Sequence, residues 1–276
     1  MSSDLYPSLT NLYGRHAVPF PSNFHWTSKV ITPLPWENRD RPILASFIGS
    51  TSSYWKRARL LRMKLAKYCD RNYPSCIRMA YANHSGERTT YLDENSSDPH
   101  RILSYRSTFC FVPVGDMPTR KGLFDSMLHG CLPVTFDPLT AVSMYTWHWS
   151  EELWKRVAVQ IPMSRDDETL SGDPVAYLKQ LLLWNSSLIE TKQKLLRRHV
   201  FSLQYALEDY RPNSSWPMHQ NGRPLQDAYL VSMELVLGWH SGRLEHRLNL
   251  TVPEFWHKGT VVKNRCVRGA KQHHKM

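Results

Sequence analysis

The sequence predicts an α/β fold in which a parallel sheet is flanked by helices. Residues 109–136 run from one short apolar stretch through a turn and a helical stretch into another apolar stretch, the pattern of a parallel unit. Residues 43–48 form a similar apolar stretch that ends in a turn before a helical segment. With 276 residues, of which 41% are hydrophobic, the chain can form one large domain or two small ones, and wholly disordered, coiled-coil and collagen-like classes are excluded.

The first hundred residues divide into a connector, a strand with its helix, and a polar insertion. Residues 1–40 are rich in proline and aromatic residues without periodicity, which indicates an extended connector. The stretch 43–48 predicts a buried strand, and Ser52 or Ser53 can cap a helix over about 54–68. Residues 70–98 are polar, and no regular element is predicted there.

The next elements complete the parallel unit and add helices. About two helical turns are expected before Ser107, followed by a strand at 109–114, a turn at 115–119, a helix at 120–129 that Gly130 ends, and a strand at 131–136. A strand at 157–161 and helices at 174–183, 188–210 and 226–239 follow, and residues from 241 onward are polar and basic. No run of about 18 apolar residues is present, so no membrane span is expected within the chain.

The charge balance indicates an anionic partner. Lys and Arg total 35 against 24 Asp and Glu, a formal net charge of +11. Such an excess favours nucleic acid, anionic lipid or a phosphate-bearing small molecule, and the alternative is a basic surface that only maintains solubility. An RNA-binding aromatic signature and zinc-finger spacing are both missing, so we expect no nucleic-acid partner.

Cysteines and glycosylation motifs bear on the compartment. None of the five cysteines forms a Cys-x-x-Cys pair; Cys69 and Cys76 are close enough to close a small loop, whereas Cys110 and Cys131 lie in apolar stretches typical of buried thiols. About one or two Asn-x-Ser/Thr motifs are expected by chance. The excess indicates a secretory-pathway lumen, which would permit a disulfide. The motifs begin at Asn83, Asn95, Asn185, Asn213 and Asn249.

Two segments have the composition of phosphate-binding turns. One runs from Gly49 to Ser53, and the other from Gly115 to Thr119, directly before Arg120 and Lys121. Free backbone N–H groups at a helix N-terminus favour an anion, and an arginine adds a planar fork of donors. The alternative for the two basic residues is a solvated helix face.

Further along the same predicted helix, Asp125 has two interpretations. A carboxylate there can accept hydrogen bonds from ribose hydroxyls, or it can simply favour the positive half of its helix. His148 stands between two tryptophans and could face a sugar ring, with a packed aromatic cluster as the alternative. Dinucleotide, P-loop and nucleophile-elbow motifs, and the Asp-x-Asp metal motif, are all missing from the sequence.

The segment from Phe109 to Val134, FCFVPVGDMPTRKGLFDSMLHGCLPV, resembles the signature of exostosin-type glycosyltransferases, family 47. Tyr145-Thr146-Trp147-His148 and residues 157–162 resemble the plant-type branch, which includes xyloglucan galactosyltransferases. Residues 18–25 and 45–50 also match in order and spacing. The resemblance covers roughly residues 13–240 and leaves the basic tail uncovered.

The resemblance implies a GT-B fold, with two Rossmann-like lobes of which the C-terminal one binds a nucleotide sugar, usually a UDP-sugar. It implies inversion by direct displacement, with no metal and no other cofactor, a base that deprotonates the acceptor hydroxyl, and positive charge that stabilises the leaving diphosphate. Asp125 and Ser126 are the ribose candidates it implies. The other donor-site candidates it implies are Gly49, Ser50, Gly115, Asp116, Thr119, Arg120 and Lys121.

The sequence also departs from the family pattern. Thr51 to Ser53 stand where the family commonly has an arginine, and Arg57 or Arg59 is a candidate substitute. Most of the acceptor lobe, which usually supplies the base, is expected to be missing, and His25 is only a weak candidate for that role. The expected organisation is a lobe remnant and connector at 1–40, a nucleotide-sugar-binding domain at 41–240 and a basic tail at 241–276.

The function that follows is transfer of a sugar, with galactose as a candidate, from a UDP-sugar to a polysaccharide or glycoprotein acceptor. The expected location is the Golgi lumen, as part of a type II membrane protein whose anchor lies outside this chain. The alternatives are a non-catalytic module that binds a polyanion or glycan through its basic surface, and an inactive homologue.

Overall fold

The computed structural model describes the residues from 17 to 240 with several gaps. The described ranges are 17–22, 40–79, 99–117, 120–137, 140–141, 144–146, 148–163, 170, 172–206 and 226–240. Contacts divide the chain into a first unit ending at Leu237 and a second beginning at Gly238, and all that follows concerns the first. Within the described ranges, no helix combines the length and apolarity that a membrane crossing requires. The expected basic tail lies outside them.

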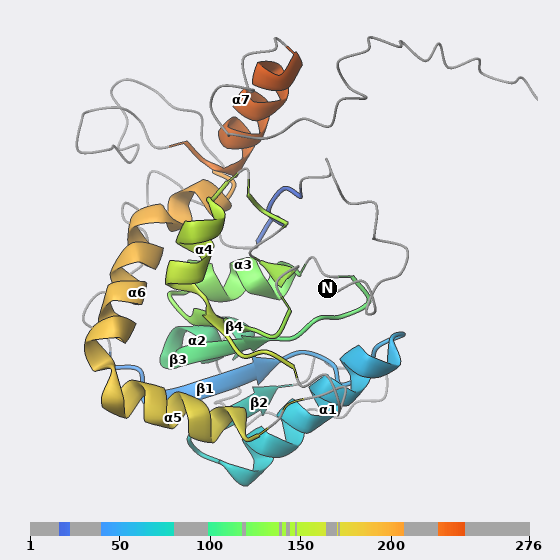
Figure 1. Ribbon diagram of the computed structural model, residues 1–276, viewed down its shortest axis with the longest axis vertical. Helices are drawn as coiled ribbons and strands as arrows, with labels where there is room; N and C mark the ends of the chain where they lie inside the picture. Colours follow the sequence, from blue (N-terminus) through green and yellow to red (C-terminus); the bar gives the residue numbers. More distant parts are fainter. Residues whose placement is uncertain are drawn as a thin grey trace, which may run out of the picture. The chain divides into compact units, whose positions relative to one another are not determined.

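A five-stranded parallel sheet forms the centre of the first unit (Figure 1). Its order is β2-β1-β3-β4-β5, and every neighbouring pair is parallel. The predicted α/β class with a parallel sheet is therefore confirmed. The strands are β1 (Ile43–Ile48), β2 (Cys76–Met79), β3 (Ser107–Val112), β4 (Leu132–Thr135) and β5 (Val159–Gln160).

Helices cover both faces of this sheet. Helices α1 and α5 contact β1 on one face, while α2 and α3 contact each other and β3 on the other face, so that in Figure 1 the sheet lies between α1 and α5 below and α3 above. The helices are α1 (Lys56–Arg71), α2 (Pro99–Arg106), α3 (Lys121–Leu128), α4 (Glu151–Val157), α5 (Pro174–Trp184), α6 (Ser186–His199) and α7 (Ala228–His240), with a 3-10 turn at Val200–Leu203.

The core centres on strands that are buried along their whole length. All six residues of β3 and all four of β4 are buried, as expected for central parallel strands covered on both faces. Phe47 of β1 and Phe109 of β3 are almost completely enclosed. Gly130 ends α3 with φ 75°, a conformation that glycine adopts without steric cost, as predicted.

Three local predictions were wrong or incomplete. The polar insertion contains β2, whose residues Cys76–Met79 pair with β1; four residues are too short for a clear periodic signal. Helix α4 was not predicted, although the Ser150 hydroxyl caps it by accepting the Leu153 N–H at 3.2 Å. Helix α1 begins at Lys56 without a serine cap, because the Ser53 hydroxyl donates to Asp116 instead.

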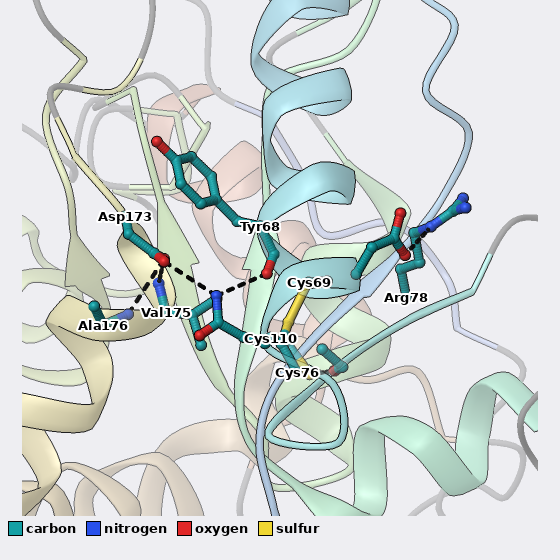
Figure 2. The surroundings of a disulfide bond; sticks show 11 residues. Tyr68, Cys69, Cys76, Arg78, Cys110, Asp173, Val175 and Ala176 are labelled. Carbon is teal, nitrogen blue, oxygen red and sulfur yellow. Dashed lines mark hydrogen bonds and ion pairs between the residues drawn. A yellow bond between two sulfur atoms is a disulfide. The ribbon is translucent and has the colours of Figure 1, made fainter.

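Two disulfides link parts of the sheet and its helices. Cys69 near the end of α1 is bonded to Cys76 at the start of β2 (Figure 2), so the small loop suggested by the sequence is closed. Cys110 of β3 is bonded to Cys131, directly before β4. The expectation that Cys110 and Cys131 are free buried thiols was therefore wrong. Pairing of β3 with β4 brings the two residues together, with Cα atoms 5.8 Å apart.

Polar contacts also fasten helix α5 to the neighbourhood of the first disulfide. Asp173 caps α5 by accepting the N–H groups of Val175 and Ala176 at 2.8 and 3.3 Å. The other carboxylate oxygen of Asp173 accepts the side-chain amide of Asn72 at 3.0 Å, just beyond the end of α1 (Figure 2). The helix pair on this face is thus held at the end where α5 begins.

Part of the expected connector packs on the same unit. Among residues 1–40, the structure describes 17–22 and Asp40. The Ala17 N–H donates to the Met144 carbonyl at 3.0 Å, and the Tyr205 hydroxyl donates to the Pro19 carbonyl at 2.8 Å. His25 lies outside the described residues, and so do the sequence motifs beginning at Asn83 and Asn95.

Candidate functional site

The strand order identifies one place in the sheet where a ligand is expected. β1 and β3 are neighbours, and the strands that follow them in sequence, β2 and β4, lie on opposite sides of this pair. The connections leave β1 and β3 in opposite directions, which is the topological switch point where open α/β sheets bind ligands at the C-terminal ends of their strands. The two turns predicted to bind phosphate follow these two strands.

Asp116 joins these two turns. Its carboxylate accepts the Tyr54 N–H at 2.7 Å and the Ser53 hydroxyl at 2.8 Å, while the Trp55 indole N–H donates to the Asp116 carbonyl at 3.0 Å. The hydrogen bond from the Tyr54 N–H, followed by that from Ser53, lowers the pKa of the Asp116 carboxyl, and the charges of Arg62 and Arg120 contribute. The ionised Asp116 carboxylate therefore holds the two turns together through these hydrogen bonds.

Arg62 is a buried cation beneath the same turns. Its side chain comes from α1, and only 3% of the residue is exposed. Its Nε donates to the Ser50 carbonyl at 2.6 Å and its Nη1 to the Val114 carbonyl at 3.3 Å, with the guanidinium carbon 5.8 Å from the centre of the Phe47 ring. One fork of donors thus binds the turn after β1 and the turn after β3.

Sequence reasoning missed Arg62, although a signal was present. The apolar face of α1 includes Ala58, Leu61 and Leu65, and at helical spacing residue 62 falls on this face. A charged side chain on an apolar helix face must find hydrogen-bonding partners in the interior, and this requirement could have identified Arg62 from the sequence. Arg57 and Arg59 were the candidates for the arginine that the family commonly has after Gly49; Arg57 is half-buried and Arg59 is exposed. The arginine that lies against Gly49 is Arg62.

Both glycines of the turns lie against arginine side chains. Gly49 has φ +149°, and a Cβ added there would lie 3.0 Å from Nη2 of Arg62. A Cβ on Gly115 would overlap the guanidinium of Arg120, with the central guanidinium carbon only 2.9 Å away. The absence of a side chain therefore lets each arginine approach the backbone of a turn, and Gly49 also needs its conformational freedom.

The remaining predicted donor-site residues lie at the start of α3. Arg120 is the N-cap residue of α3 and does not cap it with its side chain, so the first N–H groups of the helix keep the polarity that favours an anion. Lys121 forms an ion pair with Asp125 at 2.7 Å, one helical turn along. The Ser126 hydroxyl is buried and donates to the Leu123 carbonyl at 2.8 Å. Thr119 lies outside the described residues.

The structure thus brings together, at the C-terminal ends of β1 and β3, the residues Gly49, Ser50, Gly115, Asp116 and Arg120, with Lys121 beside them. Asp125, the ribose candidate, is engaged by Lys121, and Ser126 points its hydroxyl back into its own helix. Two arginines, a lysine and a helix N-terminus suit an anion with several oxygen atoms. The described residues contain no group of three or more His, Cys, Asp or Glu side chains placed to hold a metal ion.

His148 contacts helix α7. Its Nε2 lies 3.3 Å from both the Ala228 carbonyl and the Ser232 hydroxyl of α7, and burial lowers the pKa of the imidazole. The neighbouring Trp149 packs on Trp154, with ring centres 4.7 Å apart. The aromatic pair is thus formed by Trp149 and Trp154, whereas His148 itself contacts α7; Trp147 lies outside the described residues.

Comparison with known proteins identifies relatives of this chain. It is 29% identical over 248 residues to the probable xyloglucan galactosyltransferase GT15 of Arabidopsis thaliana, a match that covers 83% of this chain and 45% of the relative. It is 36% identical over 142 residues to the xyloglucan-specific galacturonosyltransferase 1 of the same plant, covering 49% of this chain and 19% of the relative. The chain thus spans less than half the length of these curated relatives.

A solved structure and a family profile complete the comparison. The structure titled "Crystal structure of GtfA/B complex" aligns with a TM-score of 0.39 at 11% identity, covering 82% of this chain and 40% of that one. The profile described as the Exostosin GT47 domain matches residues 10–170, a range that includes both turns of the switch point and all of α3. The chain therefore belongs to the exostosin GT47 family.

Proposed function

We propose that this chain binds the nucleotide-sugar donor of an inverting glycosyltransferase with GT-B architecture. The observation that carries the proposal is the switch point itself. In a chain of the exostosin GT47 family, two glycine turns are joined by Asp116 and lie against Arg62 and Arg120 at the C-terminal ends of β1 and β3. Family membership and the named relatives favour glycosyl transfer over a module that merely binds polyanions.

The proposed roles follow from charge and position. Arg120, Lys121 and the first N–H groups of α3 bind the diphosphate and stabilise the negative charge that develops on it as the sugar leaves. Gly49, Ser50 and Gly115 are proposed to line this subsite, where the glycines let Arg62 and Arg120 approach the turns. Thr119, which lies outside the described residues, stays a candidate for the same subsite. These groups supply the positive charge that a metal ion would otherwise provide, so the proposed transfer needs no metal or other cofactor.

The ribose subsite requires a rearrangement of one ion pair. Lys121 holds both carboxylate oxygens of Asp125, at 2.9 and 2.7 Å. When a diphosphate attracts Lys121, the Asp125 carboxylate becomes available to accept hydrogen bonds from ribose hydroxyls. The Ser126 hydroxyl donates to the Leu123 carbonyl within α3, so its proposed role is to support the helix rather than to contact ribose. His25, which lies outside the described residues, stays the candidate for the base that deprotonates the acceptor.

The donor is proposed to be a UDP-sugar, with galactose as the first sugar to test, and the acceptor a polysaccharide or a glycoprotein. The names of the two relatives, which specify xyloglucan with galactose or galacturonic acid, support this choice. The proposed location is the Golgi lumen, with membrane attachment through a part of the protein outside this chain. Two disulfides support an oxidising secretory compartment.

Titration calorimetry of the purified chain with UDP tests the donor site. Wild type is expected to bind UDP with EDTA present, and Arg120→Ala is expected to weaken binding at least tenfold, which corresponds to about 1.4 kcal/mol. Arg198→Ala removes the same charge from an exposed position of α6 and is expected to leave binding unchanged.

The same titration separates the alternatives. If millimolar UDP neither binds nor stabilises the wild-type chain, the donor-site proposal is wrong. Binding of heparin that weakens steeply with salt, together with indifference to UDP, would instead favour the polyanion-binding module. Loss of UDP binding on adding EDTA would contradict the metal-independent mechanism.

A further inference from the structure

An exposed corner of the fold carries a glycosylation motif that the donor site does not use. Helix α5 ends at Trp184, α6 begins at Ser186, and Asn185 stands between them as the first residue of Asn185-Ser186-Ser187. All three residues of the motif are exposed. Of the five Asn-x-Ser/Thr motifs in the sequence, this is the one that falls within the described part of the chain.

The fold uses the backbone of Asn185 but makes no capping bond with its side chain. The Asn185 N–H donates to the Leu181 carbonyl at 3.0 Å, and the Asn185 carbonyl accepts the N–H groups of Leu188 and Ile189 at 3.0 and 3.2 Å. An asparagine at an N-cap ordinarily accepts a helical N–H with its side-chain oxygen, yet here that bond is not formed. Modification of the amide nitrogen would therefore cost no bond of this corner.

Large apolar side chains surround the motif and face solvent. Trp184 directly before it is 82% exposed, Leu183 is 72% exposed, and Leu188 in the first turn of α6 is 43% exposed. Tyr177, seven residues before Trp184 and so on the same side of α5, is also exposed. Large apolar side chains exposed so close together in the chain promote aggregation unless something covers them.

We propose that Asn185 carries an N-linked glycan and that this glycan covers the apolar corner formed by Leu183, Trp184 and Leu188. The amide nitrogen of Asn185 forms a bond to the anomeric carbon of a lipid-linked oligosaccharide. The bond from that carbon to the lipid diphosphate breaks, the diphosphate leaves with the electron pair, and the amide releases one proton. The two disulfides support passage through the secretory lumen, where this reaction takes place.

The modification is compatible with a functional site elsewhere on the unit. In Figure 1 the α5–α6 corner lies on the left, where β1 begins, whereas the switch-point turns follow the arrowhead of β1. Asn185, which joins α5 to α6, therefore lies toward the end of the strands opposite to the switch-point turns. The proposal does not depend on donor binding, so either can fail without the other.

The test is to secrete the whole chain from cultured animal cells and to map its glycopeptides by mass spectrometry. The Asn185 peptide is expected to carry a hexose-rich glycan that peptide N-glycosidase removes, converting Asn185 to Asp. Asn185→Gln and Ser187→Ala are expected to lose it, while Ser187→Thr, which preserves the motif, retains it. Recovery of the Asn185 peptide unmodified from folded, secreted chain would overturn the proposal.

The covering role is tested in a variant in which the other four motifs are eliminated by Asn→Gln changes, so the glycan examined is the one on Asn185. Enzymatic removal of glycans from the variant that retains only the Asn185 motif is expected to increase binding of a hydrophobic dye, and Trp184→Ser is expected to remove most of that increase. Equal dye binding before and after removal, with the glycan shown to be present, would refute the covering role.

Discussion

Replacement of Arg62 by methionine is the most direct test of how the switch point is held together. Methionine fills much of the same volume but cannot donate to the carbonyls of Ser50 and Val114. A hydrogen bond to a charged group contributes about 1.5–3 kcal/mol. The 2.6 Å bond falls toward the upper part of that range and the 3.3 Å bond below it. We therefore expect a loss of roughly 3 kcal/mol in the free energy of unfolding.

The assay is thermal unfolding followed by urea titration, with UDP affinity as a second readout. For a unit of this size, roughly 3 kcal/mol lowers Tm by about 6–12 °C. Arg59→Met removes a charge from an exposed position of the same helix and is expected to change stability by no more than about 0.5 kcal/mol. Arg62→Lys keeps the charge without the fork and should fall between wild type and Arg62→Met. Equal stability of Arg62→Met and Arg59→Met would refute the reasoning.

Three further changes test other contacts of the fold. Gly49→Ala is expected to cost about 1–3 kcal/mol in equilibrium unfolding because of its positive φ, whereas Gly172→Ala, with open space around it, should be nearly neutral; similar values for both would contradict this account. Asp116→Asn should destabilise the chain at neutral pH, since a lowered carboxyl pKa stabilises the fold above the unfolded pKa of about 3.9 and that contribution disappears as the pH falls through the folded value; a pH-independent difference between pH 7 and pH 3 would be inconsistent with it. Alkylation of the denatured, unreduced chain should label Cys266 alone; labelling of Cys110 and Cys131 as well, mapped by mass spectrometry, would show that the Cys110–Cys131 bond does not form.

Local patterns in the sequence predicted much of the backbone. The apolar stretches at β1, β3 and β4, the helix that Gly130 ends and the two glycine turns were all readable because each depends on neighbouring residues. The short strand β2 was not, since four residues within a polar insertion become a strand only by pairing with β1. The order β2-β1-β3-β4-β5 likewise depends on contacts that no local pattern contains.

For the candidate site too, one part could be predicted from the sequence and the other depended on the tertiary structure. The sequence by itself predicted which segments could bind an anion, and membership of the exostosin GT47 family supports the proposal that this anion is a nucleotide sugar. Only the tertiary structure decided that Asp116 holds the two turns together, that Arg62 lies beneath both, and that Lys121 engages Asp125. The turns are more than 60 residues apart in the chain, and only the pairing of β1 with β3 brings them side by side. Residue type and spacing specify the conformation of a turn, whereas the partner of a side chain depends on which strands become neighbours.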